Sequence, residues 1–299
     1  VHNIIATRGA DDAIDIIIRT FCDAGDDNII ICPPTFPMYK FSAEMQGARC
    51  QSVPLTTEFQ LDLDGINKAA NDTTKAIFVC SPNNPTGNIM KREDILSLCD
   101  TYKDKALIIV DETYIEYLEQ ESSAPLSLST ALPDHENLLV LRTLSKAYGA
   151  AGLRLGSIIG HEDLIQLFLK VLPPYPLAQP VTENAVKTLE PDNLDRIKNS
   201  RDITLSQREK LIKALEQSDL VTDIFPSAAN FVLCRVTDAD SFLTRFKDNL
   251  IILRDQSKQP GLENCVRISV GTEQEMAAFY DVLKTGQREN TTHHRTASI

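Results

Sequence analysis

The sequence predicts an α/β fold in which helices cover both faces of a mostly parallel central sheet. Up to about residue 170, short apolar runs alternate with stretches whose apolar residues recur at helical spacing. The short runs are apolar at consecutive positions, which is typical of strands buried on both faces. A second, shorter set of strands and helices follows, and it predicts a smaller C-terminal α+β domain.

The first predicted element is a strand over residues 3–7, and an amphipathic helix over 11–22 follows it. In that helix Ile14, Ile17, Ile18 and Phe21 share one face at spacings of three and four residues. The remaining predicted strands of the larger part are 28–32, 50–53, 75–80, 107–111, 138–142 and 157–160. The smaller part has predicted strands over 221–225, 230–235, 251–254 and 265–269, with helices near 239–248 and 273–284.

These patterns divide the chain into four expected parts. A large domain covers 1–190, a connecting helix 191–218, a small C-terminal domain 219–286 and a polar, disordered tail 287–299. The proline-rich run over 173–180 interrupts the pattern before the connecting helix. The chain begins at Val1 without methionine, directly before a strand, so we expect an N-terminal portion to be missing.

Composition excludes several classes of partner. The 299 residues include 30 Lys and Arg against 42 Asp and Glu, a net charge of −12. Nucleic acids and anionic membrane surfaces both require clustered basic charge, so neither is expected as a main partner. Seven cysteines, an odd number without CxxC spacing, predict free thiols in a reducing cytoplasm and no metal site. Neither a membrane span nor a signal peptide is visible.

The most informative motif is a lysine flanked by hydroxyl groups. Thr143, Ser145 and Lys146 lie in one short segment, and Arg154 follows eight residues after the lysine. A lysine amine can form an imine with an aldehyde, while hydroxyls and a guanidinium can hold a phosphate. The segment therefore suits pyridoxal phosphate, although a lysine after serine is by itself most often a surface charge.

An acidic residue upstream supports this interpretation. Asp111 ends the apolar run over 107–111, where a buried carboxylate requires a cationic partner. A protonated pyridine nitrogen would be such a partner, and a structural salt bridge is the alternative. Tyr114, three residues further on, could reach the phenolate oxygen of the same cofactor.

Three loops after predicted strands supply further candidates. The N–H groups of Ala10 and Asp11 follow Gly9 at a helix start, a natural phosphate site, although an ordinary helix start would look the same. Phe36, in a proline-rich loop after residue 32, could stack on a flat ring or belong to the core. Asn84, in the turn SPNNPTG, could donate to the phenolate oxygen, and a plain turn is its alternative.

The ordered set RGAD, PPTF, SPNNPTG, DETY, TLSK and AGLR resembles that of the fold-type I pyridoxal-phosphate-dependent aminotransferases, over nearly the whole chain. Within that superfamily the closest resemblance is to the histidinol-phosphate aminotransferases. The discriminating stretches are CPPTFPMY, LRTLSKAYGAAGLRLG and ILRDQSKQPGLENCVRISVGTEQE. The resemblance implies amino-group transfer between L-histidinol phosphate and 2-oxoglutarate, in L-histidine biosynthesis.

The resemblance also implies residue roles. Lys146 would bind the cofactor covalently and carry the proton, and the other residues named above would hold its ring and phosphate. In the small domain, Arg254 and Arg267 would bind the anionic end of the substrate, and Asn230 would lie near it. Members of this family are homodimers whose N-terminal arm contributes to the partner's site, so the isolated chain is expected to dimerise poorly and to be weakly active.

Two other functions remain open at this stage. Another fold-type I enzyme, such as an aromatic aminotransferase or a phosphothreonine decarboxylase, would use the same cofactor residues. A pyridoxal-phosphate-binding regulatory module without turnover would also use these cofactor residues. Such a module would normally be fused to a DNA-binding region, and none is visible in the sequence.

Overall fold

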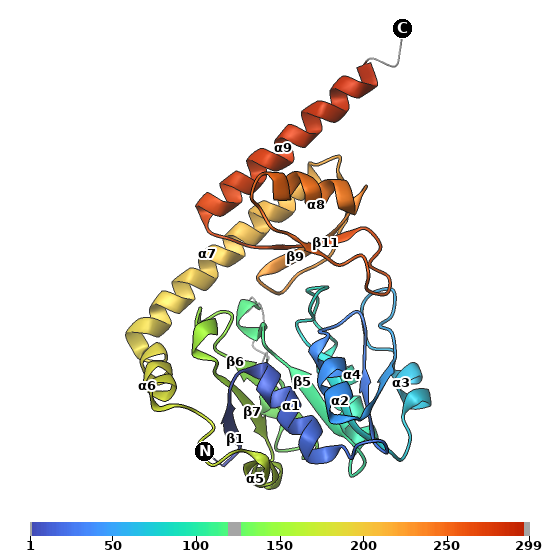
Figure 1. Ribbon diagram of the computed structural model, residues 1–299, viewed down its shortest axis with the longest axis vertical. Helices are drawn as coiled ribbons and strands as arrows, with labels where there is room; N and C mark the ends of the chain where they lie inside the picture. The colour runs from blue at the N-terminus through green and yellow to red at the C-terminus, as the bar shows by residue number, and fades with distance from the viewer. Residues whose placement is uncertain (1, 119–126, 296–299) are drawn as a thin grey trace.

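The computed structural model describes residues 2–118 and 127–295, with side chains through Lys284. Two lobes are joined by the long helix α7 (Pro191–Glu216), which runs along one side of the molecule (Figure 1). The larger lobe contains a seven-stranded sheet, and the smaller lobe contains a four-stranded antiparallel sheet. The predicted fold class is therefore confirmed.

The large sheet has the strand order β1-β7-β6-β5-β4-β2-β3. Its strands are β1 (Ile4–Thr7), β2 (Asn28–Ile31), β3 (Arg49–Ser52), β4 (Thr74–Cys80), β5 (Leu107–Asp111), β6 (Leu138–Thr143) and β7 (Gly156–Gly160). Strands β3, β2, β4, β5 and β6 pair in parallel, whereas β7 is antiparallel to both of its neighbours. Most carboxyl ends of the strands therefore meet at one edge, where ligands of such sheets bind.

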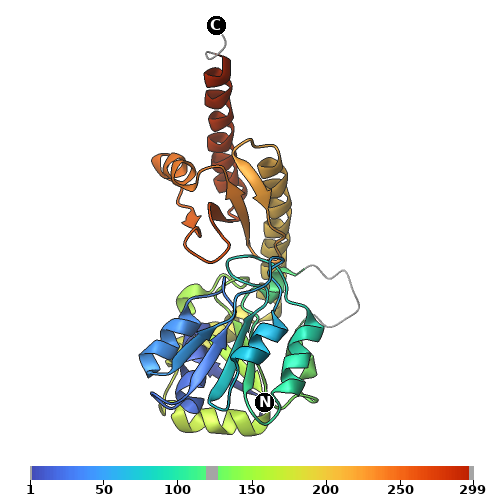
Figure 2. The ribbon, with the colours of Figure 1, turned by 90° about the vertical axis from the view of Figure 1, so that its right-hand side faces the viewer.

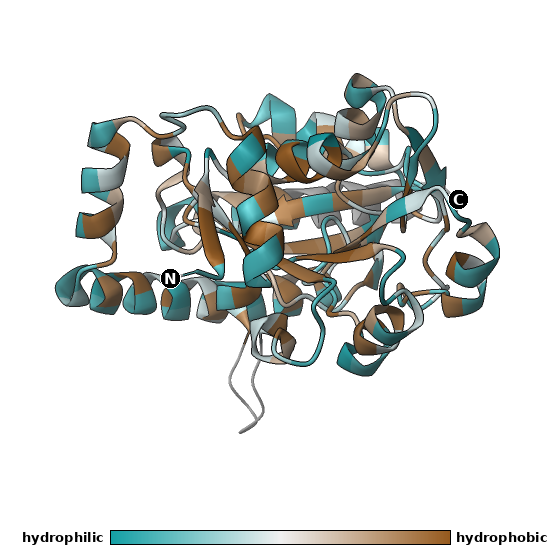
Figure 3. Cartoon of the chain, turned by 90° about the horizontal axis from the view of Figure 1, so that it is seen from below, coloured by the Kyte–Doolittle hydropathy of each residue, from teal (hydrophilic) through white to brown (hydrophobic). Residues whose placement is uncertain are grey.

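Helices cover both faces of this sheet, as Figure 3 shows by the apolar strands enclosed between them. Residues of α1 (Ala10–Phe21), α2 (Met38–Gln46) and α5 (Glu162–Val171) pack on one face. Residues of α3 (Leu63–Ala69) and α4 (Arg92–Thr101) pack on the other face. In β2, Ile29 and Ile31 belong to the first core and Ile30 to the second, which explains the consecutive apolar run.

Short helices complete the larger lobe. Three 3₁₀ turns lie in the loops after β5, before β6 and before β7: η1 (Ile115–Tyr117), η2 (Leu128–Ala131) and η3 (Ala151–Leu153). Helix α6 (Gln179–Thr188) begins inside the proline-rich run and was not predicted. Pro180 lies in the first turn of α6, where the missing N–H of proline costs no helical hydrogen bond.

The small lobe packs its sheet against α7 and the C-terminal helices (Figure 2). The sheet has the order β10-β11-β9-β8. Its elements are β8 (Val221–Ile224), β9 (Phe231–Val236), α8 (Ala239–Asp248), β10 (Arg254–Asp255), β11 (Cys265–Ser269) and α9 (Glu273–Arg295).

The C-terminal end differs from the predicted disordered tail over 287–299. Helix α9 continues through Arg295, and 296–299 lie outside the described residues. The sequence after Gly286 contains no proline and no further glycine, so nothing in the backbone chemistry stops the helix at that point. Polarity alone predicted the tail, and polarity does not prevent a solvated helix.

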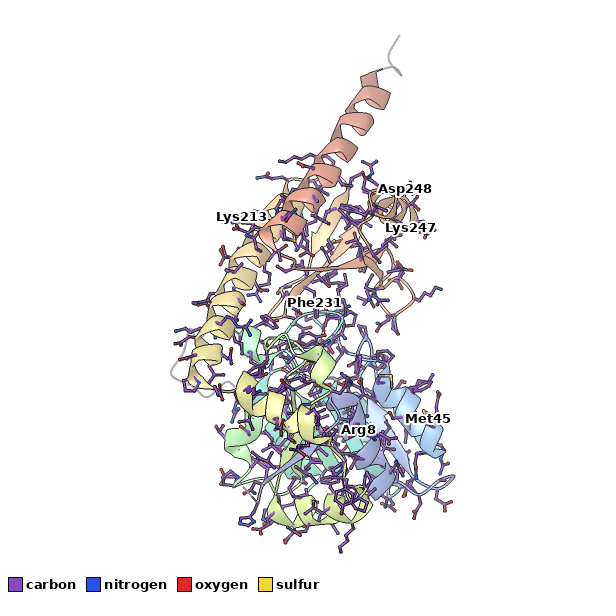
Figure 4. The ribbon with its side chains drawn as sticks, turned by 60° about the vertical axis from the view of Figure 1, so that its left-hand side comes forward. Arg8, Met45, Lys213, Phe231, Lys247 and Asp248 are labelled. Atoms are coloured by element: carbon purple, nitrogen blue, oxygen red, sulfur yellow. The ribbon has the colours of Figure 1, made fainter. Side chains whose placement is uncertain are left out.

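The lobes contact each other through the segments that follow β4, β5 and β6. The Gly87 carbonyl accepts a hydrogen bond from the Ala228 N–H at 2.7 Å. Tyr114, Ala147 and Phe231 belong to one apolar cluster, and Phe231 lies where the small sheet meets the larger lobe (Figure 4). The position of the small lobe is thus coupled directly to the loop that carries Asn84. None of the helices in the described part of the chain is long and apolar enough to span a membrane.

Candidate active site

A cavity of about 530 Å³ is lined by the loops at the carboxyl ends of the strands and by the small lobe. Every predicted site residue except Asn230 lines it: Ala10, Asp11, Phe36, Asn84, Asp111, Tyr114, Thr143, Ser145, Lys146, Arg154, Arg254 and Arg267. The structure therefore brings together motifs that are up to 257 positions apart, Ala10 to Arg267.

Lys146 lies in the turn that follows β6. Its Nζ is 5.5 Å from the centroid of the Tyr114 ring. Partial burial of the amine lowers the pKa of Lys146, and the positive charge of Arg267 lowers it further, whereas Asp11 and Asp111 oppose the change. The Lys146 side chain is exposed to the cavity that it lines. The lowered pKa therefore comes from the residues that surround the amine. The neutral amine is the nucleophilic and basic form.

Asp111 ends β5 and is 3% exposed. Its Oδ2 accepts a hydrogen bond from the Tyr39 hydroxyl at 2.8 Å, and its Oδ1 accepts from the Thr113 hydroxyl at 2.5 Å and the Thr113 N–H at 3.1 Å. Burial raises the pKa of Asp111, and these hydrogen bonds oppose the increase. Among the described residues Asp111 has no ion-pair partner, so this carboxylate can accept a cation from a ligand.

The start of α1 is a candidate anion site. The helix begins at Ala10, and the N–H groups of its first turn have no partner within the helix. The Arg154 guanidinium lies over this turn, with its Nη2 donating to the Arg8 carbonyl at 3.4 Å and 3.8 Å from Asp11 Oδ2. The Thr143 hydroxyl is 2.9 Å from the Ser145 hydroxyl, both on the same wall. A phosphate would meet N–H donors, hydroxyls and a guanidinium here.

Two glycines keep this corner open. Gly9 has φ +97°, and a Cβ there would approach Arg154 Nη2 to 2.8 Å. At Gly156 a Cβ would lie 2.6 Å from the Gly9 carbonyl carbon and 2.8 Å from the Ala10 nitrogen. These neighbours are backbone atoms that cannot rotate away, so β7 approaches the anion site closely only because residue 156 is glycine.

We expect Gly156→Ala to destabilise the protein by about 1–3 kcal/mol, because the turn before α1 must move to admit the methyl group. Denaturant unfolding of both proteins measures this difference. Gly152→Ala is the matched control, since a Cβ there meets no atom within 4 Å. Equal free energies of unfolding for the two variants would contradict the close approach.

Aromatic side chains form further walls of the cavity. The ring of Phe36 packs edge-on against Tyr39, with the centroids 5.7 Å apart, and Tyr39 stacks on Phe78 at 4.9 Å. Tyr114 packs edge-on against Phe231 at 5.2 Å. Burial raises the pKa of the Tyr114 phenol, so the hydroxyl stays protonated and can donate a hydrogen bond.

The small lobe contributes two neighbouring arginines. Arg254 and Arg267 are register partners on β10 and β11, so their side chains leave the same face of the sheet. Arg267 Nη1 donates to Asn84 Oδ1 at 2.6 Å, which leaves the Asn84 amide nitrogen for the cavity. Burial lowers the pKa of Arg267, and within the described residues its buried Nε has no hydrogen-bond partner. This guanidinium is therefore available for an anionic ligand.

Asn230 is the predicted residue that does not line the cavity. Burial raises the pKa of the Tyr117 phenol to about 12, and the nearby side chain of Asn230 opposes this rise. The predicted contact of Asn230 with substrate stays a prediction.

Several residues of the site were not predicted from the sequence. Thr113, Gln256 and Gln259 line the cavity. Tyr39 is fully buried behind it and, like Thr113, donates a hydrogen bond to Asp111. Thr113 could have been found, since a hydroxyl two residues after a strand-end carboxylate often bonds back to it. Tyr39 gave no local signal, because it meets Asp111 across 72 positions.

The complete donor set fits pyridoxal phosphate. The phosphate would fit the corner at the start of α1, and a protonated ring nitrogen would pair with the Asp111 carboxylate. A ring oxygen would accept hydrogen bonds from Asn84 and Tyr114. Lys146 supplies the amine that an aldehyde requires. Among the described residues no group of acidic, histidine or cysteine side chains could hold a metal ion.

Comparisons with known proteins agree with this geometry. The sequence profile described as "Aminotransferase class I and II" matches residues 1–283. A histidinol-phosphate aminotransferase of Salmonella schwarzengrund is 42% identical over 95% of this chain and 77% of its own length. The crystal structure of the histidinol-phosphate aminotransferase from Clostridium acetobutylicum superimposes with a TM-score of 0.86 at 22% identity, covering 96% and 84% of the two chains. That of the enzyme from Sinorhizobium meliloti, in complex with pyridoxal-5'-phosphate, gives 0.82 at 24% identity, covering 95% and 77%.

Proposed function

Because this chain belongs to the class I and II aminotransferases, we propose that it transfers an amino group between L-histidinol phosphate and 2-oxoglutarate in L-histidine biosynthesis. The cofactor is pyridoxal phosphate. The observation that carries the proposal is one cavity lined by a lysine with a lowered pKa, by a buried carboxylate without an ion-pair partner among the described residues and by a pair of small-lobe arginines.

The residues of the larger lobe would hold the cofactor. Asp111 would pair with the ring nitrogen, Phe36 would stack on the ring, and Asn84 and Tyr114 would donate to its phenolate oxygen. The phosphate would be held by Ala10, Asp11, Thr143, Ser145 and Arg154. When bound, the cofactor supplies a ring that withdraws electrons from the substrate carbon next to the amino group.

Lys146 acts on protons in this proposal. Its neutral amine would remove the proton from the substrate carbon that bears the amino group. It would then return that proton to the cofactor carbon that takes over the amino group. Burial and the charge of Arg267 both favour the neutral form. The ring of Tyr114 lies beside this amine, with its centroid 5.5 Å from Nζ, and Phe231 packs edge-on against that ring.

The small-lobe arginines would choose the substrate. A phosphate monoester carries nearly two negative charges near neutral pH, and Arg254 and Arg267 together balance them. A single guanidinium can bind the carboxylate of glutamate through two parallel hydrogen bonds. The same wall can therefore bind the amino donor and the amino acceptor in turn, as the two halves of the reaction require.

The test is a half-reaction titration of the full-length protein with L-histidinol phosphate. We expect the absorbance of the lysine-bound cofactor to convert to that of the amine form, and 2-oxoglutarate to reverse the change. Phenylalanine and threonine phosphate, offered in parallel, test an aromatic aminotransferase and a phosphothreonine decarboxylase. Faster conversion by either of them would replace histidinol phosphate as the substrate, and binding without any conversion would favour a regulatory module.

The rate of covalent cofactor uptake should rise with pH, because only the neutral amine of Lys146 attacks an aldehyde. Since burial and Arg267 lower the pKa of Lys146 from 10.5, the midpoint should lie below that value. Arg267→Gln removes one cause of the lowering, so its midpoint should move upward. Stopped-flow absorbance of cofactor-free protein mixed with pyridoxal phosphate measures both midpoints. An unchanged midpoint in the variant would contradict the coupling.

We further propose that the full-length protein is a homodimer and works in the cytoplasm. Large apolar side chains are exposed on α6 and on both sides of it in the sequence, with Tyr175, Val186 and Leu189 exposed by 93%, 65% and 45%. Such a patch favours burial against a second copy. All seven cysteines are free thiols, which agrees with a reducing compartment. Sedimentation velocity would measure the oligomeric state.

A further inference from the structure

The small-lobe wall of the cavity carries two glutamines beside the two arginines, Gln256 and Gln259. Arg254 and Asp255 pair with β11, and the Gln256 N–H continues this ladder to the Cys265 carbonyl at 2.9 Å. Alternate residues of an extended strand face the same side, so Gln256 faces the cavity with Arg254. Asp255 faces away, and its carboxylate accepts a hydrogen bond from the Ser257 N–H at 2.8 Å.

The side chain of Gln259 orients the amide of Gln256. Nε2 of Gln259 donates to Oε1 of Gln256 at 2.9 Å, and both side chains are half-buried. The carbonyl oxygen of Gln256 is thereby engaged. Among the described residues its Nε2 has no further hydrogen-bond partner, so the amide presents N–H donors to the cavity on the wall that carries Arg254 and Arg267.

This wall is made of hydrogen-bond donors. The carboxylates that line the cavity, Asp11 and Asp111, belong to the larger lobe. A phosphate monoester offers three acceptor oxygens, whereas a carboxylate offers two, which one guanidinium can satisfy. Two guanidiniums balance the charge of the phosphate, and a neutral donor can then serve an oxygen that they leave free.

We propose that Gln256 is a specificity-determining residue that donates to the phosphate of the substrate, with Gln259 as its positioning residue. The proposal rests on the proposed reaction with histidinol phosphate. The arginines favour an amine substrate that carries a phosphate through their charge. Gln256 would increase this preference over an amine substrate without a phosphate by donating a hydrogen bond.

The test compares L-histidinol phosphate with L-histidinol, which differs only in lacking the phosphate. In the full-length holoenzyme, Gln256→Leu should lower kcat/KM for histidinol phosphate about 10- to 100-fold, the effect of losing one donor to a charged acceptor. Reaction with histidinol should change less than about threefold. Gln259→Leu should cost less than Gln256→Leu, because it frees the donor to rotate without removing it.

Gln256→Glu should cost more, because it replaces the donor by a negative charge facing the phosphate. Gln274→Glu is the matched control: the same change at an exposed position of α9, outside the cavity lining. A second measurement is competitive inhibition by glycerol 3-phosphate, which carries the phosphate without an amine. Its inhibition constant should rise about tenfold in Gln256→Leu.

The outcomes separate the two proposals. Equal losses for histidinol phosphate and histidinol would overturn the role of Gln256, since a merely structural residue would lower both. If the wild-type protein did not react with histidinol phosphate, the proposed reaction would fall. Weaker inhibition by glycerol 3-phosphate in Gln256→Leu would still support the phosphate contact in that case, and unchanged inhibition would overturn it.

Discussion

Lys146→Ala should lower kcat at least about a thousandfold, because it removes both the covalent anchor and the proton carrier from the reacting carbon. Lys146→Arg should be nearly as inactive, since a guanidinium does not lose its proton near neutral pH. Borohydride reduction followed by peptide mass spectrometry provides a second measurement. The wild-type peptide that contains Lys146 should gain the mass of the reduced cofactor, and the variant should gain none.

Lys258→Ala is the matched control for this experiment. Lys258 is an exposed lysine of the small lobe that does not line the cavity, so its removal should leave kcat within about twofold. Turnover by Lys146→Ala within tenfold of wild type would show that another amine does this work, and the assignment of the catalytic residue would be wrong.

Asp111→Asn should lower kcat/KM by on the order of 10²–10³-fold, since breaking a buried charge pair costs about 3–5 kcal/mol. Asparagine keeps the shape of the side chain, and its oxygen can still accept a hydrogen bond from Tyr39 or Thr113. The loss therefore reports the missing charge. Steady-state kinetics measures it, together with the dissociation constant of the cofactor.

Glu112→Gln is the corresponding control. Glu112 is also buried, at 2% exposure, but it accepts hydrogen bonds from the Leu128 N–H and the Ser127 hydroxyl and does not line the cavity. The neutral substitution at Glu112 should thus affect unfolding more than cofactor affinity. If Glu112→Gln lost as much cofactor affinity as Asp111→Asn, the pairing of Asp111 with the ring nitrogen would be refuted.

Asp111→Asn should also stabilise the cofactor-free protein at neutral pH. Burial raises the pKa of Asp111 above its ordinary 3.8, so ionisation of this group in the folded state costs free energy. The cost is fully present above the raised folded pKa and disappears as the pH falls below the unfolded value. The stability advantage of Asp111→Asn over wild type should therefore be largest at neutral pH and should disappear in acid. Denaturant unfolding at several pH values measures this difference in free energy of unfolding.

Buried strands were the most predictable part of the fold. Strand β5 has its predicted bounds, Leu107–Asp111, because four apolar residues followed by an acid have no other stable place in an α/β lobe. Strand β10 was predicted over 251–254 but comprises only Arg254–Asp255. Leu250 and Ile252 are apolar yet 92% and 74% exposed, so hydrophobicity there gave a false strand start.

The site was predictable wherever a motif follows a strand of the parallel sheet. Asn84 follows β4, Asp111 is the last residue of β5, and Lys146 follows β6, and the parallel pairing of these strands brings their carboxyl ends together. The contacts between distant segments were not predictable. The hydroxyl of Tyr39 on Asp111 and the guanidinium of Arg267 on Asn84 depend on packing of elements that no local pattern connects.

The backbone conformation of Arg154 matters for directed evolution of this protein. Its φ of +54° lies in the left-handed region, where glycine would be the residue of lowest conformational cost. This chain has a guanidinium at a position where the backbone conformation favours a residue without a side chain. A screen that rewards heat resistance alone should therefore enrich Arg154→Gly, and those survivors would fold well while retaining cofactor poorly. Screens on this scaffold should couple survival to turnover at every round.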